Sequence, residues 1–178
     1  KPSSAASDVY KRQPEALRQT RLDYYRHVAP TAGVPTVVVM QDLDERPGIG
    51  SFWGEVNSAV HEGLGVSGVL TNGSVRDLGD LSPSFPILAA SIGPSHAFVH
   101  IHDVGTPVEV FGLRVVHDDL IHADRHGAVC IPSQLLRELP ACIELVRRKE
   151  APLLAAARAG GFGLAQIEAA LRAADDIH

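Results

Sequence analysis

Hydrophobic residues along the first half of the chain alternate between helical spacing and short β-branched runs. This pattern predicts helices over residues 14–28, 52–64 and 74–81, and strands over residues 35–41, 67–71 and 86–90. Val56, Val60 and Leu64 fall on one face of the second helix. We expect Asn72 and Gly73 to end the second strand. The order of elements is that of βα units.

The pattern changes after residue 98. Residues 99–116 alternate, and VEVFGLRVV predicts a hairpin around Phe111 and Gly112. Two more strands are expected over residues 120–123 and 128–131 around a turn at 124–127, and helices over 143–159 and 164–174. The sum is one α/β domain over residues 14–178.

The first 13 residues, KPSSAASDVYKRQ, are polar and lack periodicity. We expect them to be a disordered or non-native leader and leave them out of the fold. No secretory signal is recognised, which favours a cytoplasmic protein.

Composition narrows the function classes. The 178 residues are 45% hydrophobic and carry a formal net charge of −5 with no basic stripe, which argues against nucleic acid as a ligand. Apolar runs such as Val37–Met40 are far too short to span a membrane. Cys130 and Cys142 are expected to be buried free thiols in a reducing compartment.

The Arg76–Asp77 pair is the first candidate for chemistry, because it follows a strand, and ligands of open α/β sheets gather at the carboxyl ends of strands. An aspartate can bind Mg²⁺ or Mn²⁺, and an arginine can hold a carboxylate or an enolate oxygen. The same residues also fit a capping box, with Ser74 as the N-cap and Asp77 at the third helical position. The local pattern leaves both interpretations open.

Glu55 lies 21 positions before Arg76, at the start of the preceding helix. A βαβ unit would bring it to the same rim as Arg76. Alternatively, it simply complements the helix dipole.

Residues 63–68 match G-x-G-x-x-G, the dinucleotide fingerprint. A nucleotide-binding loop must follow a strand and open a helix, whereas this one follows a helix and opens a strand. We therefore interpret it as a helix C-cap and turn.

Histidines gather in residues 96–126, and His100 and His102 would share one strand face, as two ligands of a transition metal do. No second ligand motif accompanies them, so hydrogen-bonded or exposed histidines are the favoured interpretation. His96 is a candidate acid or base. No nucleophile motif is present.

Two longer motifs carry a family resemblance. The first is G-V-x-x-x-G-x-x-R-D, which ends in Arg76 and Asp77, and the second is D-L-x-x-A-D-x-x-G-x-x-x-I-P, which runs from Asp119 to Pro132. With them, residues 34–174 resemble the RraA-like family, which includes regulators of ribonuclease E activity and 4-hydroxy-4-methyl-2-oxoglutarate aldolases. The resemblance implies a swivelling β/β/α domain with C-terminal helices, assembled as a homotrimer or a dimer of trimers.

The resemblance also implies roles for individual residues. Asp77 would bind the divalent metal, Arg76 would bind the pyruvoyl end and stabilise the enolate, and Glu55 would orient a metal-bound water or relay a proton. Backbone N–H groups of Ser51, Phe52, Trp53 and Gly54 would hold the substrate carboxylate. Glu150 of a neighbouring subunit is a candidate for closing the site. Asn72 departs from the aspartate usual in the family.

The implied activity is that of a class II, metal-dependent aldolase or oxaloacetate decarboxylase. Such a lyase uses Mg²⁺ or Mn²⁺ and acts on 4-hydroxy-2-oxo acids or oxaloacetate through a pyruvate enolate. The alternative is a non-catalytic regulatory binding protein similar to the ribonuclease E regulator.

Overall fold

The computed structural model describes residues 15–29, 31 and 33–178, and the expected leader over residues 1–13 lies outside them. The described residues form two compact units, one ending at Cys130 and one beginning at Ile131. The mixed α/β class with C-terminal helices is confirmed. The single domain expected over residues 14–178 stays a prediction.

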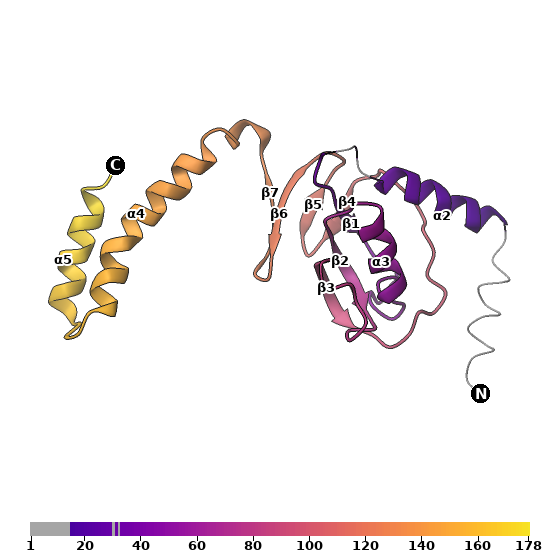
Figure 1. Cartoon of the computed structure of the whole chain (residues 1–178), viewed down its shortest axis with the longest axis horizontal. Helices are drawn as coiled ribbons and strands as arrows, with labels where there is room; N and C mark the ends of the chain where they lie inside the picture. Colours follow the sequence, from indigo (N-terminus) through magenta and orange to yellow (C-terminus); the bar gives the residue numbers. More distant parts are fainter. Residues whose placement is uncertain (1–14, 30, 32) are drawn as a thin grey trace. The chain divides into compact units, whose positions relative to one another are not determined.

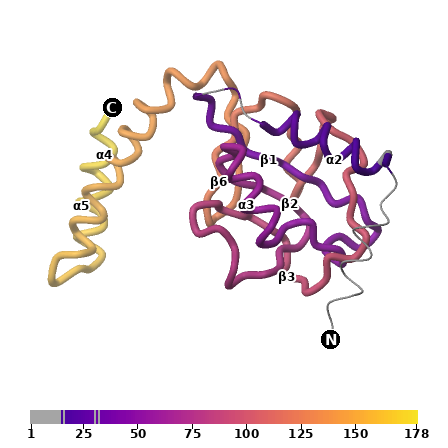
Figure 2. Tube along the Cα trace, turned by 45° about the vertical axis from the view of Figure 1, so that its right-hand side comes forward, coloured from indigo at the N-terminus to yellow at the C-terminus, as the bar shows by residue number. Residues whose placement is uncertain are grey.

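The N-terminal unit is built on a parallel sheet with strand order β1-β2-β3 (Figure 1). Its elements are α2 (Glu15–Val28), β1 (Val37–Met40), α3 (Glu55–Gly63), β2 (Gly68–Val75) and β3 (Ile87–Ile92). Figure 2 traces the chain from α2 through β1 and α3 into β2. The β1–α3–β2 segment is thus the βαβ unit that the sequence predicts.

Two hairpins follow. Strands β4 (Val108–Val110) and β5 (Leu113–Val115) pair antiparallel, and Phe111 and Gly112 have φ of 54° and 76°, as a two-residue type I′ turn requires. Strands β6 (Leu120–Asp124) and β7 (Gly127–Ile131) form another two-stranded sheet. Both predicted hairpins are confirmed.

The C-terminal unit is helical. It contains the 3₁₀ turn η1 (Ser133–Leu135) and the helices α4 (Leu139–Arg158) and α5 (Leu164–Asp175), which pack against each other. Gly161, with φ of 76°, lies in the turn between them. Nowhere in the described part of the chain is a helix long and apolar enough to cross a membrane.

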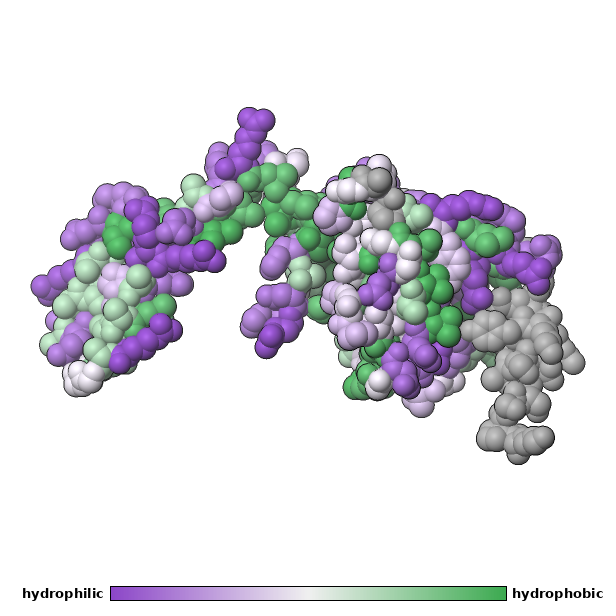
Figure 3. Space-filling model, viewed as in Figure 1, coloured by the Kyte–Doolittle hydropathy of each residue, from purple (hydrophilic) through white to green (hydrophobic). Residues whose placement is uncertain are grey.

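The core of the N-terminal unit joins α2, the sheet and the loop before α3. Its buried members are Tyr24, Val28, Val38, Phe52, Trp53, Val66, Val69, Val75 and Phe85. Large apolar side chains remain exposed in both units, and hydrophobic surface is visible in Figure 3.

Helix α3 turns its apolar face outward. Val56 and Val60 do share a face, as predicted, but they are 62% and 37% exposed, while Asn57, Ser58 and His61 are buried. The buried face tolerates polar groups because each of these three side chains has a hydrogen-bond partner.

The predicted break at Asn72 is wrong, and so is the predicted helix over residues 74–81. Strand β2 continues to Val75 through a register shift between Thr71 and Ser74, where the Thr71 hydroxyl accepts the Gly73 N–H at 3.0 Å. Residues 77–80 make only a single turn, in which Asp77 has φ of 57°. A left-handed residue cannot continue an α-helix.

Two further expectations are wrong. Residues 99–107 pair with no strand of the described chain, so His100 and His102 share no strand face. Cys130 is half-buried and Cys142 is exposed, and both are free, so neither is the buried thiol that was expected.

The G-x-G-x-x-G segment is confirmed as a helix C-cap. The Val66 N–H donates to the His61 carbonyl and the Gly65 N–H donates to the Glu62 carbonyl, and Gly65 has φ of 90°. This is a Schellman motif, which leads the chain from α3 into β2.

Candidate functional site

Arg76 and Asp77 lie directly beyond the carboxyl end of β2. The loop before α3 runs beside this end, because Trp53 forms a parallel bridge with Val75 and the Arg76 N–H donates to the Trp53 carbonyl at 3.0 Å. Two segments that are 22 residues apart in the sequence therefore meet at one edge of the sheet.

The Asp77 carboxylate lies at the N-terminus of α3. Its Oδ2 accepts the Glu55 N–H at 3.2 Å and is 2.7 Å from Nη1 of Arg76. The N-cap residue of α3 is Gly54, which has no side chain to cap the helix. Asp77 supplies that cap from another segment, so it caps the preceding helix and not one of its own.

Gly54 gives the pair its space. A Cβ at this position would be 2.5 Å from Oδ2 of Asp77 and 3.0 Å from Cγ of Arg76. The φ of Gly54 is −171°, which any residue can adopt, so steric room and not backbone freedom requires glycine here.

The Arg76 side chain is 21% exposed, and its guanidinium keeps binding capacity. Nη1 pairs with Asp77, while the buried Nε has no hydrogen-bond partner among the described residues. A buried N–H without a partner is costly unless a ligand or water satisfies it. Asp77 therefore holds one part of the guanidinium, and another part remains available to a ligand.

Glu55 enters the site through its backbone. Its N–H contacts Asp77, and its side chain is exposed in the first turn of α3. The structure thus brings together the backbone of Glu55 and the side chains of Arg76 and Asp77, which the sequence reasoning proposed as one group.

The loop over residues 51–54 is buried, and the N–H and hydroxyl groups of Ser51 are bonded within the protein. The Ser51 N–H donates to the Ser95 carbonyl at 2.9 Å, so it is not available to a substrate carboxylate in this arrangement. The Ser51 hydroxyl lies 2.9 Å from the Trp53 carbonyl and 2.8 Å from the Ser74 carbonyl. Ser51 thus links this loop to the end of β2 by hydrogen bonds.

Asn72 has a structural explanation. Its Oδ1 accepts the Asp42 N–H at 2.6 Å, and its Nδ2 donates to the Asp42 carbonyl at 3.1 Å. The side chain thereby continues the pairing of β1 with β2 past Met40 and Thr71. An aspartate could accept the first bond but could not donate the second.

The other candidates do not join this group. His96 lies in the loop after β3, with Nδ1 3.1 Å from the Ala97 carbonyl. Glu150 is exposed on α4 in the C-terminal unit. Within the described ranges, no three His, Cys, Asp or Glu side chains are grouped closely enough to hold a metal ion.

Metal chemistry at Arg76–Asp77 would have to use the carboxylates of Asp77 and Glu55. These are the hard oxygen donors that Mg²⁺ prefers, and Mg²⁺ usually keeps several waters and takes only one or two carboxylates from a protein. The donor chemistry therefore fits Mg²⁺ or Mn²⁺ and does not resemble a zinc site.

A buried network beside the site was missed by the sequence reasoning. The Tyr24 hydroxyl lies 2.6 Å from Nε2 of His61, and Nδ1 of His61 lies 2.6 Å from the Asn57 carbonyl. Burial lowers the pKa of His61 and raises the pKa of Tyr24. The i, i+4 spacing of Asn57 and His61 was the available signal, but nothing in the sequence pairs it with Tyr24.

Comparisons with known proteins bear on the fold. RraAS2 of Streptomyces coelicolor, described as an unusual member of the RNase ES inhibitor RraA protein family, is 20% identical, with a TM-score of 0.59 over 78% of this chain and 68% of its own. An uncharacterized protein from Pseudomonas syringae pv. tomato is 22% identical, with a TM-score of 0.58 over 76% of this chain. This chain spans 65% of that protein's length. No curated protein matches the sequence.

These likenesses show a shared fold. The family match is more direct, because residues 17–130 match the RraA-like family, described as Aldolase/RraA. That range contains β1 to β6, α3, all but the first two residues of α2, and the Arg76–Asp77 pair. The chain therefore belongs to the RraA-like family.

Proposed function

We propose that the protein is a divalent-metal-dependent lyase that cleaves a carbon–carbon bond of 4-hydroxy-2-oxo acids or oxaloacetate through a pyruvate enolate. One observation carries the proposal. A partly buried arginine with an unpartnered Nε lies against a carboxylate that is held at a helix N-terminus. Family membership is compatible with it, because the family includes aldolases and ribonuclease inhibitors.

Arg76 acts on the oxygen that becomes negative. When the bond beyond C3 of a 2-oxo acid breaks, its electron pair moves into the C2–C3 bond and the keto oxygen gains charge. The guanidinium offers N–H donors in a fixed plane, which suits a carboxylate or an enolate oxygen. The partial positive charge at the start of α3 adds to this stabilisation.

Asp77 and Glu55 would each supply a carboxylate to the site. Asp77 positions Arg76 through the 2.7 Å ion pair. The exposed Glu55 side chain can exchange protons with solvent and relay one to the enolate carbon. A divalent ion held by Asp77, with Glu55 nearby, would polarise the 2-oxo carbonyl.

The remaining assignments extend this proposal. The N–H groups of residues 52–54 would hold the substrate carboxylate, without that of Ser51. In a homotrimer or a dimer of trimers, Glu150 of a neighbouring subunit would cover the site.

The test is pyruvate release from oxaloacetate and from 4-hydroxy-4-methyl-2-oxoglutarate, with Mg²⁺ or Mn²⁺ and then with EDTA. We expect turnover above the metal-only background, and its loss with EDTA. Arg76→Ala should lower kcat/KM by about a hundredfold or more, whereas Arg125→Ala, in the β6–β7 turn, should leave it unchanged. Near-wild-type turnover in Arg76→Ala would refute the assignment.

Asp77→Asn separates chemistry from capping. Asparagine keeps an oxygen that can accept the Glu55 N–H but loses the negative charge. We expect the variant to remain folded, judged by its unfolding midpoint, and to lose turnover. If it retains full turnover, the carboxylate is a cap only.

A regulatory binding protein is the second candidate. The observation in its favour is that Asp77 is already engaged by Arg76 and by the Glu55 N–H, which a purely structural role would also explain. A folded protein without metal-dependent turnover on either substrate would favour this role.

A further inference from the structure

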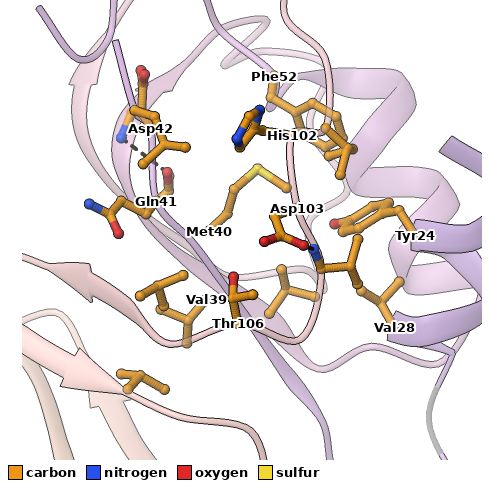
Figure 4. A pocket seen from close by; sticks show the side chains of 18 of the residues that line it. Tyr24, Val28, Val39, Met40, Gln41, Asp42, Phe52, His102, Asp103 and Thr106 are labelled. Atoms are coloured by element: carbon orange, nitrogen blue, oxygen red, sulfur yellow. Dashed lines mark hydrogen bonds between the residues drawn. The ribbon is translucent and has the colours of Figure 1, made fainter. Parts of the chain in front are cut away.

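The N-terminal unit contains a cavity of about 860 Å³ whose lining lacks the three side chains of the proposed chemistry (Figure 4). It is lined by residues of α2, β1, the segment over residues 97–108 and the chain after β5. Glu55, Arg76 and Asp77 do not line it. Its volume falls within the range typical of small-molecule sites, roughly 300–1,000 Å³.

Much of the lining is apolar. Val28 and Phe52 are 7% and 9% exposed and belong to the core, and Met40, Val99 and Ile101 pack against that core. Such a wall favours a ligand with an apolar body.

The charged lining has only one sign. Five aspartates line the cavity, namely Asp42, Asp44, Asp103, Asp118 and Asp119, and four histidines line it as well. No lysine or arginine of the described residues does so. A cleft lined by charges of one sign concentrates ligands of the opposite sign. An anionic 2-oxo acid is therefore disfavoured here.

Several polar groups are already fixed or lack partners. Asp103 accepts the Val104 N–H at 2.8 Å, and Asp119 accepts the Val116 N–H at 2.8 Å, so both carboxylates are oriented. Figure 4 shows Asp42 and Asp103 among the lining side chains. Ser74 and Trp53 also line the cavity, are each 1% exposed, and have an Oγ and an Nε1 without hydrogen-bond partners among the described residues.

We propose that this cavity is a second binding site, which takes a small cation with an apolar body, such as an arylalkyl amine. The apolar wall would bury the body, and the aspartates would hold the ammonium group by charge-assisted hydrogen bonds. This site is independent of the Arg76 chemistry, whose ligand is an anion.

Three probes that differ only at one end test the proposal: tryptamine, the alcohol tryptophol and indole-3-propionate. Their dissociation constants are measured by titration calorimetry at pH 8, where histidine side chains are ordinarily neutral. We expect tryptamine to bind at least about tenfold more tightly than indole-3-propionate, with tryptophol between them. Equal binding of the three probes, or no saturable binding of tryptamine, would overturn the proposal.

Matched double variants locate the effect. Asp103→Asn with Asp119→Asn keeps the acceptors for both backbone N–H groups and should raise the tryptamine Kd about three- to tenfold. Asp80→Asn with Asp175→Asn changes the net charge equally at exposed positions outside the cavity and should leave the Kd unchanged. Equal weakening by both doubles would show a general charge effect and refute the site.

Arg76→Ala separates this inference from the proposed function. It should abolish lyase turnover and leave tryptamine binding intact. Loss of tryptamine binding in this variant would show that the two ligands share one site. It would overturn the proposal, whatever the outcome for turnover.

Discussion

Gly54 and Asp77 depend on each other. Gly54 is the N-cap of α3 and leaves room for the Asp77 carboxylate, which then caps the helix in place of an N-cap side chain. The same carboxylate orients Arg76 at 2.7 Å. Because Gly54 has no Cβ, one carboxylate can both cap α3 and orient Arg76 in the proposed site.

Gly54→Ala should lower both stability and turnover. Its Cβ would stand 2.5 Å from Oδ2 of Asp77 and must displace it, which costs about 1–3 kcal/mol in the free energy of unfolding. Gly63→Ala is the control, because a Cβ at Gly63 meets nothing within 4 Å, and Ala stabilises a helix by up to about 1 kcal/mol over Gly. Urea denaturation measures the free energy of unfolding, and pyruvate release measures turnover. If Gly54→Ala has the same free energy of unfolding as wild type, the capping role is contradicted.

Asn72→Asp should destabilise the protein even though it restores the residue usual in the family. The change removes the donor to the Asp42 carbonyl and brings a negative charge beside that oxygen, at a cost of about 1–3 kcal/mol. Gln134→Glu adds the same charge at an exposed position and should be near neutral. Equal stabilities of Asn72→Asp and wild type in chemical denaturation would show that the amide pairing contributes nothing.

At the scale of elements, α2 and α3 are joined by a buried polar contact. His61 is 0% exposed, with its two ring nitrogens next to the Tyr24 hydroxyl and the Asn57 carbonyl. A histidine that donates from Nδ1 to a carbonyl and accepts at Nε2 from a hydroxyl is neutral. Burial accordingly lowers the pKa of His61.

The pH dependence of stability follows from that direction. The unfolded chain binds a proton near the ordinary histidine pKa of 6.5, while folded His61 resists protonation, so its contribution is present above about pH 6.5 and is lost as the pH falls through the folded pKa. His61→Gln should flatten the fall in stability between pH 7 and pH 5. His100→Gln, at an exposed histidine, should not. The free energy of unfolding is measured with urea at each pH. If it falls equally steeply with pH in wild type and in His61→Gln, this account is refuted.

Strand β2 shows why local patterns misjudge some elements. Asn72, Gly73 and Ser74 are turn and cap residues by propensity, yet they lie in a strand. The Asn72 side chain and the Ser74 carbonyl have partners in distant segments, because Asn72 pairs with Asp42 and the Ser74 carbonyl accepts from Ser51. Hydrogen bonds to distant segments outweigh the local preference.

At the scale of the whole molecule, the exposed apolar surface is consistent with the trimer that the family resemblance implies. Val56 on α3 and Leu78, just beyond Asp77, are 62% and 54% exposed. We expect light scattering to give a mass of three or six times the 19.0 kDa of one chain. A monomer at micromolar concentration would contradict the assembly and the role proposed for Glu150.

The sequence by itself determined the first βαβ unit, both hairpins, the C-terminal helices and the position of Arg76–Asp77 beyond a strand, because these depend on local periodicity and turn chemistry. It also determined the family, through two motifs. Only the tertiary structure decided that Asp77 caps α3, that Gly54 makes room for it, that α3 buries its polar face, and that Arg76 is absent from the lining of an acidic cavity. Each of these depends on contacts between segments distant in the chain, which local spacing does not encode.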